Sequence, residues 1–114
     1  MVLRRSFCGL LMLAAVACVS PTIPLPPPEA PSIARGSEPL TAHLVGRNVE
    51  PNAIIVVYNL NTGVPRDRRV TGAQADESGN WECDVRYAQE GEFVSIAQEV
   101  NGERSSARSF PLRF

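Results

Sequence analysis

Few side chains in this 114-residue chain could carry out nucleophilic catalysis. His43 is the single histidine, so a Ser-His-Asp triad would have to use it, yet the sequence has no Gly-x-Ser-x-Gly elbow. A thiol and imidazole pair of Cys83 and His43 is the other option. However, Cys83 alternates with Trp81 and Val85 on the predicted inward face of a strand, and a buried thiol is inert. His43 has the opposite phase to its apolar neighbours and should lie outside. We therefore predict no enzyme activity and no cofactor.

Metal-ligating residues are also sparse. The chain has 3 cysteines and 1 histidine, which are too few for a zinc cluster. Asp76, Glu77 and Asn80 gather oxygen atoms in one segment, but calcium needs about six to eight such ligands. A tight turn explains the same residues, because Asp begins turns and Gly79 supplies a positive φ. We predict no metal site here.

The one dense charge cluster contains Arg66, Arg68 and Arg69, together with Asp67, on a predicted loop or edge strand. Charges at such places protect a sheet edge from pairing with another chain. Guanidinium groups can also bind an anionic headgroup or a glycan carboxylate through two hydrogen bonds. The three arginines are therefore the candidate surface contact. The whole chain has 11 basic and 12 acidic residues, a balance that disfavours a nucleic-acid partner.

Residues 1–17 have the organisation of a secretory signal peptide. Arg4 and Arg5 precede an apolar run over residues 7–17, and Pro21 ends any helix soon afterwards. The run is shorter than the roughly 20 residues that a membrane-spanning helix needs. A buried core helix is the alternative, but nothing downstream offers it a helical partner.

The end of this run, Ala15-Val16-Ala17-Cys18, resembles the lipobox of bacterial lipoproteins, although Ala15 stands where leucine is usual. The resemblance implies cleavage before Cys18, a diacylglyceryl group on its thiol and an acylated new amino terminus. Residues 15–17 equally form an Ala-x-Ala site for ordinary signal peptidase, cut at the same bond. Without lipid, Cys18 would be a free thiol on an exported protein, which favours lipidation. Val19 after the cysteine resembles the pattern of outer-membrane lipoproteins.

Residues 18–37 are predicted to form a Pro-rich linker. Six prolines lie between Pro21 and Pro31 and exclude a helix or a central strand. Extended as polyproline II, this linker would reach about 60 Å. A ligand for an SH3-like groove is the alternative, but bacterial export makes such a partner a poor match.

Residues 38–114 are predicted to form a small all-β domain. Turn signals recur along them and no segment has a 3.6-residue apolar period. We expect strands over residues 40–46, 53–60, 68–73, 80–87, 92–100 and 103–112. In the first of them, Leu40 should share the inward face with Ala42 and Leu44. The strand over residues 53–60 should be covered on both faces, because apolar residues occupy both of its alternating sets of positions. Trp81 should be the centre of the core. An antiparallel β-sandwich buries this apolar surface better than an open sheet.

The dipeptide Asn101-Gly102 predicts a hairpin with a type I′ turn. A two-residue loop sets Glu99 opposite Arg104, an exposed cross-strand charge pair, and Ile96 opposite Ala107.

The chain resembles the bacterial immunoglobulin-like modules of exported adhesins and surface proteins. The matching parts, in chain order, are Gly46, residues 50–58, the segment Ala75-Asp76-Glu77-Ser78-Gly79-Asn80-Trp81 and the closing hairpin. Asn52 replaces the customary glycine of the first turn. The resemblance implies a small immunoglobulin-like β-sandwich.

The expected function is that of a lipid-anchored envelope protein, which contacts the membrane through its lipid and presents a non-enzymatic binding or structural module to an envelope protein or glycan. Two alternatives remain: an accessory subunit of a larger envelope complex, and a secreted or periplasmic protein without lipid.

Overall fold

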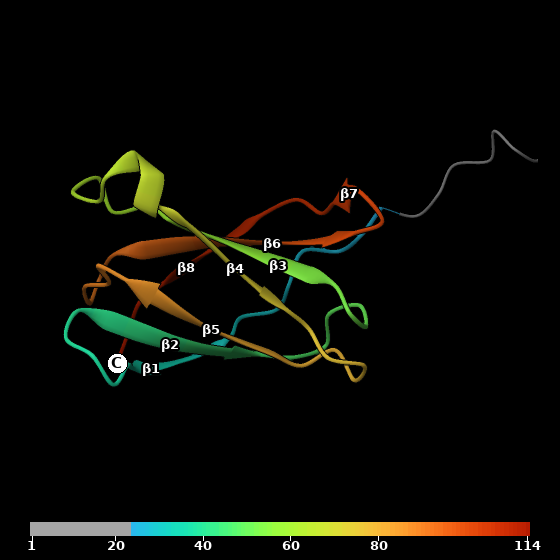
Figure 1. Cartoon of the computed structure of the whole chain (residues 1–114), viewed down its shortest axis with the longest axis horizontal. Helices are drawn as coiled ribbons and strands as arrows, with labels where there is room; N and C mark the ends of the chain where they lie inside the picture. Colours follow the sequence, from blue (N-terminus) through green and yellow to red (C-terminus); the bar gives the residue numbers. More distant parts are fainter. Residues whose placement is uncertain (1–23) are drawn as a thin grey trace, which may run out of the picture.

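The computed structural model describes residues 24–114, which form two antiparallel sheets packed as a sandwich (Figure 1). The predicted all-β sandwich is therefore confirmed. The predicted signal peptide (1–17), its cleavage site and Cys18 lie outside the described residues. The smaller sheet has the order β1 (Ser32–Arg35), β2 (Thr41–Gly46), β5 (Trp81–Arg86). The larger sheet has the order β4 (Val70–Gln74), β3 (Ile54–Asn59), β6 (Phe93–Val100), and β6 then pairs with β7 (Glu103–Arg104) and β8 (Arg108–Pro111).

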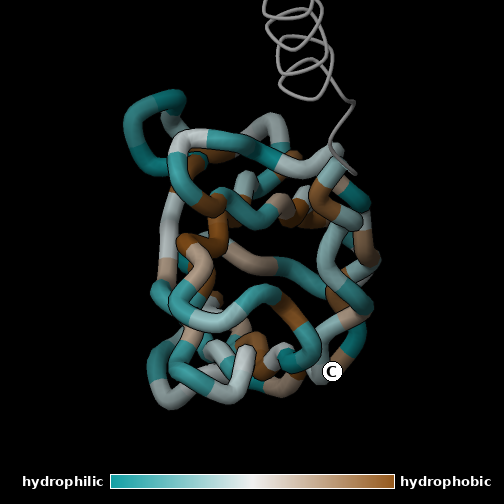
Figure 2. Tube along the Cα trace, turned by 90° about the vertical axis from the view of Figure 1, so that its right-hand side faces the viewer, coloured by the Kyte–Doolittle hydropathy of each residue, from teal (hydrophilic) through white to brown (hydrophobic). Residues whose placement is uncertain are grey.

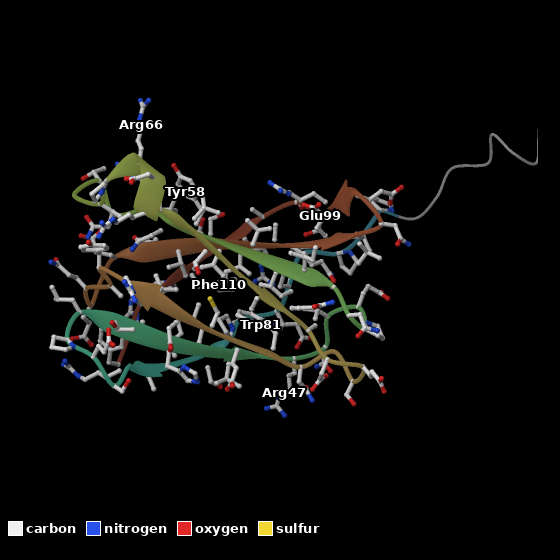
Figure 3. The ribbon with its side chains drawn as sticks, viewed as in Figure 1. Arg47, Tyr58, Arg66, Trp81, Glu99 and Phe110 are labelled. Atoms are coloured by element: carbon white, nitrogen blue, oxygen red, sulfur yellow. The ribbon has the colours of Figure 1, made fainter. Side chains whose placement is uncertain are left out.

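The core lies between the two sheets and forms as the alternation in the sequence predicts. In β5, Trp81, Cys83 and Val85 are buried and the residues between them are exposed. Figure 2 shows hydrophobic and hydrophilic positions interspersed along the described chain. Trp81 and Phe110 lie between the sheets (Figure 3), which confirms Trp81 as a core residue. The indole packs directly on Gly46, where a β-carbon would lie 2.2 Å from ring atoms.

The prediction that the strand around residues 53–60 is covered on both faces is wrong. Ile55, Val57 and Asn59 are buried, whereas Ile54 and Tyr58 on the opposite face are exposed. None of the described elements packs on this outer face of the larger sheet. The apolar residues on the second face of β3 therefore form an exposed apolar surface, and no second layer covers them within the described chain.

The prediction that Leu40 faces the core is also wrong. Leu40 lies before β2 with a φ of 56° and is exposed, so only Ala42 and Leu44 point inward.

The predicted linker over residues 18–37 ends earlier than expected. Ser32–Arg35 pair with β2, and Pro28 is fully buried. The Gln98 side-chain Nε2 donates a hydrogen bond to the carbonyl oxygen of Pro26 at 2.7 Å. The segment from Pro26 onward therefore packs on the sandwich, and the predicted 60 Å spacer is wrong. Between Cys18 and Pro24, the first described residue, only residues 19–23 remain, and the distance from Cys18 to Pro24 is at most about 20 Å.

The closing hairpin is confirmed at its turn and corrected beyond it. Asn101 and Gly102 both have positive φ, and Arg104 Nη2 lies 2.9 Å from Glu99 Oε2. Ile96, however, faces Arg108 and not Ala107. One extra residue separates β7 from β8, because Ser105 exchanges hydrogen bonds with the backbone of Gln98 through its own N–H and its Oγ. The predicted strand 103–112 is therefore two short strands.

The placement of β4 creates an open side of the sandwich. In constant-type immunoglobulin domains the fourth strand joins the sheet of the first, second and fifth strands. Here β4 pairs with β3 instead. The edge strand β4 of one sheet and the edge strand β5 of the other therefore run along the same side of the molecule, where they contact each other.

Candidate binding surface

His43 and Cys83 lie on opposite faces of the smaller sheet. In the register of β2 and β5, His43 pairs with Asp84 and Leu44 pairs with Cys83. The Cys83 side chain points into the core, where burial raises the pKa of its thiol and the hydroxyl of Thr71 lies 3.9 Å from its sulfur. His43 points outward, as the sequence predicts. The imidazole therefore cannot activate this thiol.

The His43 ring is held between two carboxylates of β5. Nδ1 lies 2.6 Å from Asp84 Oδ1, and Nε2 lies 3.4 Å from Glu82 Oε2. The hydrogen bond to Asp84 and the charges of both carboxylates raise the pKa of His43 above its ordinary value of 6.5, and partial desolvation opposes them. The protonated imidazole thus links two side chains of the neighbouring strand.

This cluster predicts a stability that depends on pH. Because the pKa of His43 is higher in the folded chain, its contribution is fully present below pH 6.5 and is lost as pH rises through the folded pKa. We expect the NMR titration midpoint of the His43 ring to lie above 6.5 and to fall in Asp84→Asn. The size of the effect is small because the groups are solvent-screened. A midpoint unchanged by Asp84→Asn would contradict this assignment.

The three candidate arginines lie in and after a short 3-10 helix, η1 (Arg66–Arg68), and have different environments. The Arg66 side chain points away from the sandwich (Figure 3). Arg68 Nη1 donates to the hydroxyl of Tyr87 at 2.8 Å. Arg69 donates to the carbonyl oxygens of Val64 at 3.0 Å and Thr62 at 3.2 Å, so it fastens the preceding loop. Arg66 and Arg68 can still meet a ligand, whereas Arg69 uses two of its three guanidinium nitrogens to hold the loop.

The acidic turn has the geometry that turn chemistry predicts. Asp76 Oδ1 accepts hydrogen bonds from the backbone N–H groups of Ser78 and Asn80, both at 2.9 Å, and Gly79 has a φ of 78°. Within residues 24–114, no three His, Cys, Asp or Glu side chains gather as a metal ion would require.

Two neighbouring hollows lie along the open side of the sandwich between β4 and β5, and we call them together the β4–β5 groove. The half beside η1 is lined by Arg68, Arg69 and Arg86, with Asp84 opposite. The other half is lined by Asp76 and Glu82 and contains no arginine. Three arginines outnumber the one carboxylate in the first half, which is therefore positively charged, and the two carboxylates make the second half negatively charged.

The outer surface of the larger sheet is the feature that sequence reasoning missed. Val70 is 57% exposed, Ile54 is 50% exposed and Phe93 is 47% exposed. With Val56 and Tyr58 they lie on one face of β4, β3 and β6, and we call these five residues the apolar face. The sequence did contain a sign of this face, because β3 has apolar residues at both of its alternating sets of positions. The sequence alone could not show that one of the two sets is exposed.

Neither models of known protein families nor curated proteins gave a match to this chain. Over the described part of the chain, no helix has the length and apolar character needed to cross a membrane.

Proposed function

We propose that the protein is a lipid-anchored envelope protein whose sandwich is a non-enzymatic binding or structural module. The observation that carries this proposal is the apolar face. Large side chains such as Ile54, Val70 and Phe93 leave much of their surface in water, and contiguous apolar patches of this kind mark interaction sites. A purely structural spacer would have no need of such a face.

The position of the N-terminal segment supports presentation of the sandwich from a membrane. The described chain begins beside the β6–β7 hairpin, where Gln98 holds Pro26, and η1 lies at the other end of the molecule (Figure 1). An anchor at Cys18 would attach to the hairpin end. Arg66 and Arg68 would then lie far from the anchor and remain accessible to an envelope protein or an anionic glycan.

The placement of His43 and Cys83 supports a role without catalysis. The one histidine is engaged by carboxylates on the outside of the smaller sheet, and the thiol is buried on the inside with its pKa raised. A nucleophile and a base need to lie within hydrogen-bond reach of each other.

The test is the intact mass of the mature protein from a membrane fraction, beside a Cys18→Ser variant. We expect a wild-type chain that begins at Cys18 and carries two or three acyl chains, because several chains anchor a protein firmly where one does not. The Cys18→Ser variant should be soluble or unprocessed. An unmodified Cys18 terminus in the soluble fraction would contradict the anchor and favour a secreted or periplasmic protein. Separation of the two membranes then tests the outer-membrane location that Val19 favours.

The apolar face also suits an accessory subunit of a larger envelope complex, because such a surface is covered in a stable assembly. Extraction in mild detergent separates the two roles. An accessory subunit should co-purify with another protein in a fixed stoichiometry, and a free-standing module should be extracted without one.

A further inference from the structure

The open edge of β4 lacks the protection that the other edge strands have. β1 contains Arg35, β5 contains three charged residues, and β8 contains Arg108 and Pro111. Charged side chains and proline are the usual means of preventing an edge from pairing with another chain. β4 has the sequence Val-Thr-Gly-Ala-Gln, with neither a charge nor a proline. The predicted protective arginines lie before the strand, in and beside η1.

Only β3 pairs with β4 in the described chain, so the other edge of β4 has no partner strand, although the Gly72 carbonyl oxygen lies 4.0 Å from Cys83 Sγ. Asn59 N–H donates to the carbonyl of Arg69, and Ala75 N–H donates to the carbonyl of Ala53. These bonds show which residues of β4 direct their backbone groups toward β3. Hydrogen-bonded pairs alternate along an antiparallel ladder. The N–H and C=O groups of Val70, Gly72 and Gln74 therefore point to the open edge. Their side chains lie on the outer face, where Gly72 presents no side chain at all.

The charges of the β4–β5 groove select the partner. Arg68 and Arg86 lie at the end where β4 begins, and Asp76 and Glu82 lie at the end where it finishes. If a second copy of β4 runs antiparallel to the first, the positive end of each groove meets the negative end of the other. The charge pattern is thus complementary to itself.

We propose that two copies of this chain associate by antiparallel pairing of their β4 strands about a twofold axis at Gly72. Val70 of each copy then lies opposite Gln74 of the other, and the two Gly72 residues face each other. Arg68 of each copy approaches Asp76 of the other. The larger sheets become one continuous sheet, and the two apolar faces lie on the same side of it. This association goes beyond the proposed function and does not depend on the lipid anchor.

A register-specific disulfide tests the pairing. The double variant Val70→Cys with Gln74→Cys places two thiols opposite each other between copies, at the Cα separation of about 5.5 Å that suits a disulfide. In each single variant the equivalent thiols of the two copies are about 13 Å apart along the strand direction. We expect oxidation of the full chain in membranes to give a covalent dimer from the double variant only. The wild-type chain controls for the natural cysteines. Both substituted side chains are exposed, so the core is unchanged.

Light scattering of the full chain in mild detergent gives a second, independent measurement. We expect a dimer for the wild type and a dissociation constant about tenfold higher for Arg68→Glu, which brings like charges together. Adding Glu77→Arg, on the acidic turn, should restore much of the affinity. A wild-type monomer, single-cysteine variants that cross-link as readily as the double variant, or a complex of one copy with a different protein would each overturn the proposal.

Discussion

Replacing Gly46 by alanine is expected to lower the free energy of unfolding by about 3 kcal/mol. The added β-carbon would lie 2.2 Å from the indole atoms of Trp81, far inside van der Waals contact. Trp81 is buried among core residues of both sheets, and close-packed interiors do not make room by small shifts. Either the indole leaves its position or β2 separates from β5. Urea unfolding monitored by the fluorescence of this single tryptophan measures the loss directly.

Two controls show whether the steric conflict with Trp81 is the cause. Gly63→Ala adds the same methyl group in a loop, where the nearest atom, Asn61 Oδ1, is 3.4 Å away, so stability should change little. Trp81→Phe removes part of the indole, and its combination with Gly46→Ala should cost less than the sum of the single changes. Strict additivity in this double-mutant cycle, measured by circular dichroism, would show that the contact is not responsible.

Replacing Gln98 by leucine is expected to lower the free energy of unfolding by about 2 kcal/mol. Gln98 is 1% exposed, and its amide joins two separate segments to the larger sheet. Oε1 accepts a hydrogen bond from the backbone N–H of Glu50 at 3.0 Å, and Nε2 donates to Pro26 at 2.7 Å. Leucine preserves the volume but leaves both backbone groups without a partner. The cost follows from these unpaired groups because no cavity is created.

The same substitution should release the segment before β1. Once the hydrogen bond to Pro26 is lost, limited proteolysis should cut residues 24–31 faster, while the sandwich itself remains resistant. Gln89→Leu, at an exposed position, is the matched control and should alter neither stability nor cleavage. If Gln98→Leu left the cleavage rate unchanged, the hydrogen bond to Pro26 would not be what fastens this segment.

Local features of the fold were predictable because neighbouring residues determine them. Asn101 and Gly102 adopt positive φ, which the type I′ turn needs, and this turn sets Glu99 opposite Arg104. The side chain of Asp76 closes its own turn. The strict alternation of apolar residues in β5 placed Trp81 in the core. Each of these depends on contacts within a few residues along the chain.

The candidate binding surface was only partly predictable. The arginine cluster was visible in the sequence, but the engagement of Arg69 by the loop carbonyls depends on how that loop closes. The apolar face was misread because an apolar residue on β3 has the same sequence signature whether its face is covered or exposed. Coverage is a property of the whole assembly of sheets and cannot be read from one strand.

By itself, then, the sequence determined the all-β class, the turns and the inward residues of β5, since φ preferences and side-chain alternation act locally. Only the tertiary structure decided that β4 joins β3, that Ser32–Arg35 form a strand on β2, and that Gln98 holds Pro26. These outcomes join residues distant in the chain. Their free energies depend on which surfaces are still available when the sheets pack, and no local pattern encodes that competition.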